Sequence, residues 1–557
     1  MSKVPFSRNE ELTRLLEHKF DIAQLRVTEG AGRDPAKVCL NGTRVDVLSK
    51  MRKWIHGLEG ADARLLLLVG QAGVGKSAIT HSIANEYAKL GRLGAMFCFS
   101  KDRGSEHFFR TIARNLADMD HLYAAALSAS ITLDTATSPY PEIQMKDLLL
   151  AAFESLSVLG PIVIVIDALD ECSDPDPIVD CLNQNIHSFP PNIRIVMSSR
   201  PSEAQGLMEY DWVKVYDLEK ESARDEDIFL YVQEQLQGAR PRKKASGLKA
   251  EDLMSIVSAS EGLFQYASTL CKEIVSAVKH RNRTRESPMQ TFNRLVKDGK
   301  GGLDALYTSI LENLYGEPNG EDNSIHGQDA LQVFRQVVGW ILVAQHRLSH
   351  SSLVDFGRAI YVSNPEEDGY DAVSNVLQPL GALFSGTQSP SATVYPLHSS
   401  IRNFLLDSKR SKRFCVGSGA DQHASMASVS FRLMVSTLRF NIANLESSYV
   451  LNEDVPDFNQ RVLSSVPRSL LYASTHWGTH LSLSTCSSVQ FEGISDIVTL
   501  YNEKILFWLE VLGLERTVMS AETTSQFLLQ WLQVSADKNE HDHEHVYELT
   551  FIRGVHF

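Results

Sequence analysis

The sequence predicts a multidomain α/β + α chain of 557 residues, in which a doubly wound α/β domain is followed by domains built mainly from helices. Three observations support this order. Short apolar runs at 65–69 and 162–166 alternate with helical patterns, as in a parallel sheet covered by helices. Beyond residue 221 the apolar spacing becomes predominantly helical. The chain is also too long for one hydrophobic core, so several domains are expected.

Composition and charge narrow the class of protein. Hydrophobic residues make up 43% of the chain and charged residues 22%, which is ordinary for a globular protein. The net charge of −14 argues against broad nonspecific nucleic-acid binding. The seven cysteines lie far apart without a Cys-x-x-Cys pair, so we expect reduced thiols in a cytoplasmic protein. Neither a signal peptide nor a transmembrane segment is expected, because every apolar run is short.

The first 38 residues are expected to form a helix and a linker rather than a domain of their own. Residues 10–25 have a helical apolar spacing, and residues 29–37 are rich in glycine and include a proline. Next, Cys39-Leu-Asn-Gly-Thr-Arg44 leads into a predicted helix, which precedes the first apolar strand. An α/β domain is therefore predicted over 39–220.

A glycine-rich loop follows the strand predicted at 65–69. It has the pattern Gly-x-x-x-x-Gly-Lys-Ser and precedes a helix, which is the order of a P-loop NTPase. Its glycines let backbone N–H groups turn towards a phosphate, and the helix directs its positive dipole end at the same anion. Lys76 can reach the β- and γ-phosphates, and the Ser77 hydroxyl suits a Mg²⁺ ligand position. The predicted nucleotide-binding residues of the loop are Gly70, Gln71, Ala72, Gly73, Val74, Gly75, Lys76 and Ser77.

Acidic residues follow the most apolar strand of the sequence. The run 162–166 has five β-branched residues in succession and continues as Asp-Ala-Leu-Asp-Glu. The chemistry of α/β sheets gathers at the carboxyl ends of their strands. We therefore expect Asp167 to hold Mg²⁺ and Asp170 or Glu171 to orient or deprotonate an attacking water. A later predicted strand ends in Ser-Ser-Arg-Pro, where Arg200 could sense the γ-phosphate.

The rest of the chain is expected to form three mostly helical domains. A helical domain is predicted over 221–320. Residues 321–410 have a winged-helix-like order, in which helices precede a two-stranded wing and a helix that begins near His398. Residues 411–557 are helical again. Two polar clusters are interpreted as solvated surface, a basic one at 279–285 and a histidine-rich one at 541–545.

Taken together, these residues resemble those of fungal NACHT proteins, whose NTPase region is grouped with the nephrocystin-like N-terminal domain. Such proteins are STAND ATPases related to the NLR immune receptors. The resemblance covers about residues 39–515. It is carried by the segments 39–44, 70–77, 166–172, 198–201, 261–267, 397–405 and 470–477.

The resemblance implies an ATP-dependent conformational switch that serves as an NLR-like signalling module. Slow hydrolysis would return an ATP-bound, homo-oligomerising form to a closed ADP-bound form, with Mg²⁺ as cofactor. A protein trigger or effector is implied as well. His398 is implied to touch the β-phosphate of ADP from the winged helix, although its sequence position also suits a residue that caps a helix. The chain departs from animal relatives at Gly262-Leu-Phe264, where they carry Gly-x-Pro against the adenine.

Two alternative functions remain open. A small-molecule or nucleotide kinase would need a compact lid and an acceptor site, whereas more than half of this chain follows the predicted NTPase domain. A nucleotide-binding interaction scaffold without turnover is the other alternative, and the intact acidic residues after the strand at 162–166 argue against it. We therefore expect weak ATP hydrolysis that serves switching rather than metabolism.

Overall fold

The computed structural model divides the chain into two compact units, Met1–Cys271 and Lys272–Phe557. The histidine-rich segment, the basic cluster apart from Lys279 and most of the helix expected over 10–25 lie outside the described residues. The described residues are 22, 25, 28, 30–57, 63–100, 104–221, 224–238, 248–279, 287–297, 302–315, 325–361, 372–447, 449–484, 491, 493–518 and 520–538.

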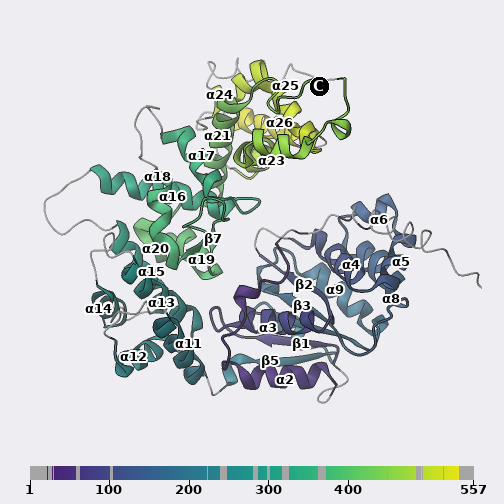
Figure 1. Ribbon diagram of the computed structural model, residues 1–557, viewed down its shortest axis with the longest axis vertical. Coiled ribbons are helices and arrows are strands. Elements are labelled where there is room, and N and C mark those ends of the chain that lie inside the picture. Colours follow the sequence, from purple (N-terminus) through teal and green to yellow (C-terminus); the bar gives the residue numbers. More distant parts are fainter. Residues whose placement is uncertain are drawn as a thin grey trace, which may run out of the picture. The chain divides into compact units, whose positions relative to one another are not determined.

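The first unit is built around a five-stranded parallel sheet (Figure 1). In spatial order, the strands are β2 Leu93–Cys98, β3 Ile162–Asp167, β4 Ile193–Ser199, β1 Leu65–Val69 and β5 Val213–Asp217. The three inner strands β3, β4 and β1 are buried along their whole length. The parallel sheet confirms the predicted α/β fold class.

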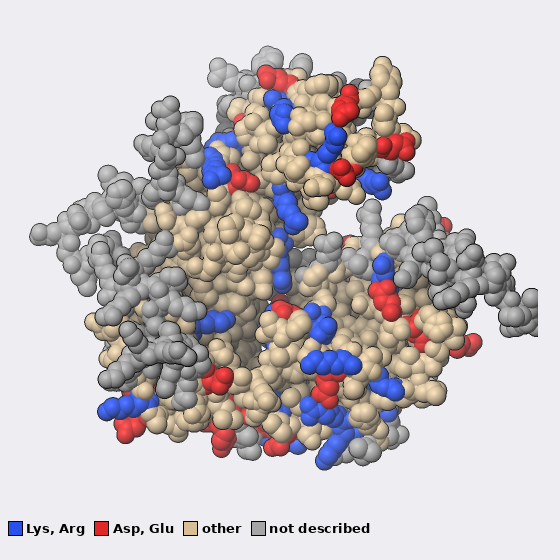
Figure 2. Space-filling model, viewed as in Figure 1, with Lys and Arg blue, Asp and Glu red and all other residues tan. Residues whose placement is uncertain are grey.

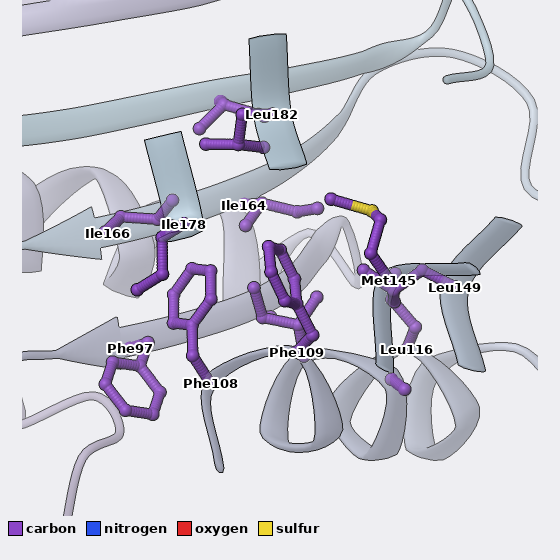
Figure 3. Close-up of a cluster of buried hydrophobic side chains, with 14 of the residues drawn as sticks. Phe97, Phe108, Phe109, Leu116, Met145, Leu149, Ile164, Ile166, Ile178 and Leu182 are labelled. Atoms are coloured by element: carbon purple, nitrogen blue, oxygen red, sulfur yellow. The ribbon is translucent and has the colours of Figure 1, made fainter. Parts of the chain in front are cut away.

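Alternate residues of β3 enter two separate cores, one on each face of the sheet. Ile164 and Ile166 pack in a core with Phe108 and Phe109, which Figure 3 shows. Val163 and Val165 belong to the other core, to which the helices α2 (Val45–Ile55) and α3 (Lys76–Lys89) contribute. Since successive strand residues point to opposite faces, a strand buried on both faces has to be apolar throughout. This is why the run at 162–166 has no polar residue.

The helices of the first unit precede, separate and follow these strands along the chain. Three of them, α11 to α13, follow β5, the last strand of the sheet, and α13 extends past the boundary at Cys271. The helix bounds are α2 Val45–Ile55, α3 Lys76–Lys89, α4 Phe108–Met119, α5 His121–Ser130, α6 Leu133–Thr137, α7 Pro141–Gln144, α8 Ala151–Phe153, α9 Asp176–Asn185, α10 Gln205–Met208, α11 Arg224–Gly238, α12 Ala250–Ser260 and α13 Phe264–Lys279.

The second unit is mostly helical. A short antiparallel pair, β6 Phe384–Ser385 and β7 Tyr395–Pro396, lies between α18 and α19, and the winged-helix assignment stays a prediction. Its helices are α14 Pro288–Phe292, α15 Gly302–Tyr315, α16 Ile325–Val343, α17 His350–Tyr361, α18 Ala372–Leu377, α19 Ser399–Leu406, α20 Ser408–Ser411, α21 Gly419–Thr437, α22 Phe458–Ser465, α23 Arg468–Ser482, α24 Ile494–Thr499, α25 Ile505–Leu514 and α26 Ser520–Lys538.

Helix hydrophobicity and surface charge bear on whether the chain contacts a membrane or a strongly charged partner. In the described part of the chain, no helix is both long enough and apolar enough to cross a membrane. Figure 2 shows Lys and Arg side chains interspersed with Asp and Glu side chains over the described part of the visible face.

Candidate functional site

The glycine-rich loop connects β1 to α3 at the carboxyl edge of the sheet. Gly73 and Gly75 have φ angles of +87° and +99°, a left-handed region that a larger side chain would occupy only with strain. Gly75 is also the N-cap of α3 and has no side chain to bond the first N–H groups of that helix. Gly73 and Gly75 therefore have conformations that favour glycine, and a helix N-terminus follows them.

Lys76 folds back over this loop. Its Nζ donates hydrogen bonds to the carbonyls of Gly70 and Gln71, over 2.6 and 3.0 Å. Burial lowers the pKa of Lys76, and the nearby Asp170 carboxylate partly offsets this effect. Asp167, Glu171 and Arg200 act on the same ammonium group. The structure thus brings Lys76 together with the predicted acidic residues and with Arg200.

Asp167 is held by hydroxyl groups from two other elements. Its side chain is buried, and Ser198 Oγ on β4 donates to its Oδ1 over 2.6 Å. Thr80 Oγ1 on α3 lies 2.9 Å from the same Oδ1 and 3.0 Å from the carbonyl of Ser77. Ser77 itself is exposed. A carboxylate and hydroxyls are hard oxygen ligands, so this residue set fits the hydrated Mg²⁺ that the sequence predicts.

The turn after β3 brings a carboxylate against an arginine. Ala168 has a left-handed backbone with φ of +58° and precedes a 3₁₀ turn over Leu169–Glu171. Asp170 Oδ2 pairs with Arg200 Nε at 2.8 Å, and only 6% of the Asp170 side chain is exposed. Its Oδ1 is buried and has no hydrogen-bond partner among the described residues. A predicted catalytic carboxylate and the predicted γ-phosphate sensor thus contact each other.

A third residue cluster includes Asp167 and was not predicted from the sequence. Ligand atoms of His81, Cys98 and Asp167 lie within 4.8 Å of one another. His81 Nδ1 accepts a hydrogen bond from the Asp34 N–H over 3.1 Å, and burial lowers the pKa of His81. A neutral imidazole therefore carries its proton on Nε2, which faces Cys98 Sγ at 3.7 Å. Since a metal-ligating histidine donates from its second nitrogen, this geometry favours hydrogen bonding over metal binding.

Two more residues, Arg44 and Gln265, contact the loop from its outer side. Neither was among the site residues predicted from the sequence. Arg44 Nη2 donates to the Val74 carbonyl over 2.7 Å. The Gln265 N–H donates to the Gly73 carbonyl over 3.0 Å. A Cβ added to Gly75 would lie 3.9 Å from the Phe264 ring, so the segment 262–264 lies beside the loop. Both residues lie in segments that carry the resemblance, Arg44 in 39–44 and Gln265 in 261–267.

His398 lies in the second unit, as the N-cap of α19. Its Nδ1 accepts a hydrogen bond from the Ser400 N–H over 3.1 Å. This is the helix-capping contact that the sequence position also suited. A contact of His398 with a nucleotide stays a prediction.

The comparison with known families concerns the first unit alone. Residues 42–200 match the family model described as nephrocystin 3, N-terminal. The matched range includes the glycine-rich loop, the acidic turn after β3 and Arg200, and it supports a nephrocystin-like, NACHT-type N-terminal domain. No curated protein matches the chain significantly.

Proposed function

We propose that this chain is a nucleotide-dependent conformational switch that binds ATP or ADP with Mg²⁺ and hydrolyses ATP slowly. One observation carries the proposal. A glycine-rich loop, Lys76 and the acidic residues after β3 converge at the carboxyl edge of one parallel sheet. The family match over 42–200 is compatible with a NACHT-like nucleotide-binding module.

In this proposal the loop and Lys76 bind the phosphates. The Lys76 ammonium already crosses the loop, so it would exchange two carbonyl acceptors for phosphate oxygens of higher negative charge. Ser77 and Asp167 would hold Mg²⁺, which neutralises charge on the phosphate oxygens when it is bound. The hydrogen bond from Ser198 fixes the orientation of the Asp167 carboxylate for this role.

Slow turnover agrees with the position of the proposed general base. Asp170 or Glu171 would orient or deprotonate the attacking water. Asp170 is paired with Arg200, which stabilises the carboxylate and makes it a weaker base. Asp170 can therefore act on a water only if Arg200 moves away from it. Arg200 would leave Asp170 when it meets the γ-phosphate, and ATP would thereby release the base.

The same ion pair favours a second candidate function, a nucleotide-binding scaffold without turnover. If Arg200 stays on Asp170 when ATP binds, the carboxylate remains neutralised and the chain holds ATP without cleaving it. Single-turnover hydrolysis separates the two functions, because the switch consumes bound ATP and the scaffold does not.

The remaining parts of the proposal concern the second unit and the partners. We place helical, winged-helix and C-terminal helical domains after the α/β domain, with His398 on the β-phosphate of ADP in a closed state. The ATP form would assemble into a homo-oligomer in the cytoplasm and engage an effector protein. These roles follow the resemblance of the sequence to NACHT proteins.

The nucleotide that copurifies with the full-length chain tests the proposal directly. We expect stoichiometric ADP or ATP after denaturation and chromatography, and slow conversion of ATP to ADP and phosphate in a single-turnover assay. A folded protein that binds neither nucleotide in the presence of Mg²⁺ would reject the proposal. Transfer of the phosphate to a small acceptor instead of water would indicate a kinase.

A further inference from the structure

We infer that the Arg44 guanidinium and the backbone N–H of Gln265 are positioning groups that hold the phosphate loop from its outer side. In this way they set the affinity of the loop for the β-phosphate. The inference rests on the proposed nucleotide-binding function of the same loop, and it adds a regulatory contact from the helices that follow the sheet.

The two groups bond to successive carbonyls of the loop. The Gln265 N–H donates to the Gly73 carbonyl over 3.0 Å, and Arg44 Nη2 donates to the Val74 carbonyl over 2.7 Å. The contact of Arg44 is buried on both sides. Water therefore does not replace it readily if it is lost.

These contacts determine where the loop directs its own donors. In a trans peptide the carbonyl and the following N–H point in opposite directions, and the described chain contains no cis peptide bond. Bonds to the carbonyls of Gly73 and Val74 therefore turn the N–H groups of Val74 and Gly75 away from Arg44 and Gln265. Converging backbone N–H groups form an anion-binding concavity, so the outer contacts preserve its inner geometry.

Arg44 is fixed in place by residues of the helices α11 and α13. Only 4% of Arg44 is exposed, and its guanidinium lies 4.8 Å from the centre of the Phe264 ring. Asp227 Oδ2 lies 3.9 Å from Arg44 Nε. Stacking on an aromatic ring and a nearby carboxylate orient a planar guanidinium well. The position of Arg44 therefore depends on two helices, α11 and α13, that follow the last strand of the sheet in the sequence.

It follows that the helices α11 and α13 and the phosphate loop influence each other. A shift of the first turn of α13 would remove the donor to Gly73 and the ring beneath Arg44 together. The two loop peptides could then rotate, and phosphate affinity would fall. By thermodynamic linkage, a bound nucleotide must stabilise the contacts of α11 and α13 with Arg44 and the loop by the same factor.

The test removes the backbone donor while keeping the helix. Gln265→Pro deletes the N–H at the second residue of α13, where the helix itself does not use it. Gln265→Ala is the matched control, because it keeps the N–H and removes only a side chain that donates to Thr269. We expect Gln265→Pro to raise the Kd of ADP about three- to tenfold, whereas Gln265→Ala stays within about twofold.

A comparison of ADP with AMP distinguishes positioning from general damage. Calorimetry on the full chain should show that Gln265→Pro and Arg44→Ala weaken ADP binding while AMP binding changes less than about twofold. Arg44→Lys should recover part of the lost ADP affinity. The double variant Gln265→Pro/Arg44→Ala should raise the Kd of ADP by less than the product of the two single fold-changes, because both changes act on the same loop. Circular dichroism and thermal melting check the fold of each variant.

The inference is overturned if the parent binds ADP and folded Gln265→Pro and Arg44→Ala bind ADP with the parent's affinity. It is also overturned if both nucleotides weaken equally, because the effect would then not concern the β-phosphate. A parent chain that binds neither ADP nor ATP would reject the nucleotide-binding function itself, which separates the two failures.

Discussion

The hydroxyl of Ser198 at the end of β4 donates a hydrogen bond of 2.6 Å to Oδ1 of Asp167 at the end of β3. The same hydroxyl accepts a hydrogen bond from the Ala168 N–H over 2.9 Å. Since β4 lies between β3 and β1, its carboxyl end is adjacent both to the acidic turn and to the phosphate loop. The strand order thus places Ser198 and Arg200 between the two parts of the site.

Ser198→Ala should misorient Asp167. The change leaves a buried carboxylate oxygen and the Ala168 N–H each short of a partner, at a cost of about 1–3 kcal/mol in unfolding free energy. Mg²⁺-dependent nucleotide affinity should fall with it. Ser199→Ala is the control, because Ser199 Oγ is buried without a hydrogen-bond partner among the described residues. Denaturant melts and ADP titrations with and without Mg²⁺ measure both effects; equal behaviour of the two variants would contradict the role of Ser198.

Lys76→Ala should weaken ATP and ADP binding by at least about tenfold, equivalent to about 1.4 kcal/mol. The reason is the loss of the ammonium group that crosses the loop. Lys89→Ala, at the exposed end of the same helix, should bind as the parent does. Calorimetry provides the comparison, and an unchanged affinity in a folded Lys76→Ala variant would remove this residue from the site.

Amide variants should separate binding from hydrolysis. Asp170→Asn or Glu171→Gln should retain ATP and suppress turnover, because a water-orienting carboxylate acts mainly in the transition state. Glu171→Gln is the cleaner change, since Asp170→Asn also weakens the ion pair with Arg200. Asp167→Asn should instead weaken Mg²⁺-dependent binding. Single-turnover rates equal to the parent's in all three variants would show that the acidic turn has another role.

His398→Ala should release ADP faster and assemble more readily, if His398 reports the bound nucleotide. Losing one charge-assisted hydrogen bond, about 1.5–3 kcal/mol, would shift the closed–open ratio about ten- to a hundredfold. His398→Asn is the matched variant, because asparagine also accepts a bond from the Ser400 N–H and keeps the helix cap. Stopped-flow ADP release and light scattering test this. If both variants match the parent, His398 is a capping residue only.

The second unit should lose stability in mild acid. Burial lowers the pKa of His476 to about 4, and it holds the pKa of His480 well below its ordinary value, with further lowering from His423. An unfolded histidine has a pKa of about 6.5. Below about pH 6.5 the unfolded chain therefore binds more protons, and the free energy of unfolding decreases, by at most about 1.4 kcal/mol per pH unit for each histidine.

Urea melts at about pH 7.5 and about pH 5 measure this loss, which should be absent above about pH 7. His476→Gln should reduce the pH dependence, whereas His187→Gln, at an exposed position of the first unit, should leave it unchanged. Equal pH dependence in the parent and in His476→Gln would show that His476 does not titrate as its burial implies.

Local patterns predicted the sheet and the loop because their causes are local. A run of five β-branched residues needs two apolar faces, and the glycines at 73 and 75 occupy left-handed positions. The contacts between distant segments were not predictable, because they depend on strand order. The pairing of Asp170 with Arg200 requires β3 and β4 to be neighbours, and the contact of Arg44 with Val74 requires α2 to begin behind the loop.

The backbone of Arg44 has a consequence for which substitutions this position tolerates. With φ of +55°, the position favours glycine, and a larger residue costs about 1–3 kcal/mol there. The loop carbonyl of Val74 nevertheless requires a long, planar donor. Backbone strain and ligand affinity therefore make opposite demands on one residue. Arg44→Gly would relieve the strain, but it would also leave the buried Val74 carbonyl without its donor and remove the contact with the Phe264 ring, losses of the same order in free energy. Substitutions at this position would therefore change nucleotide retention more than they change thermostability.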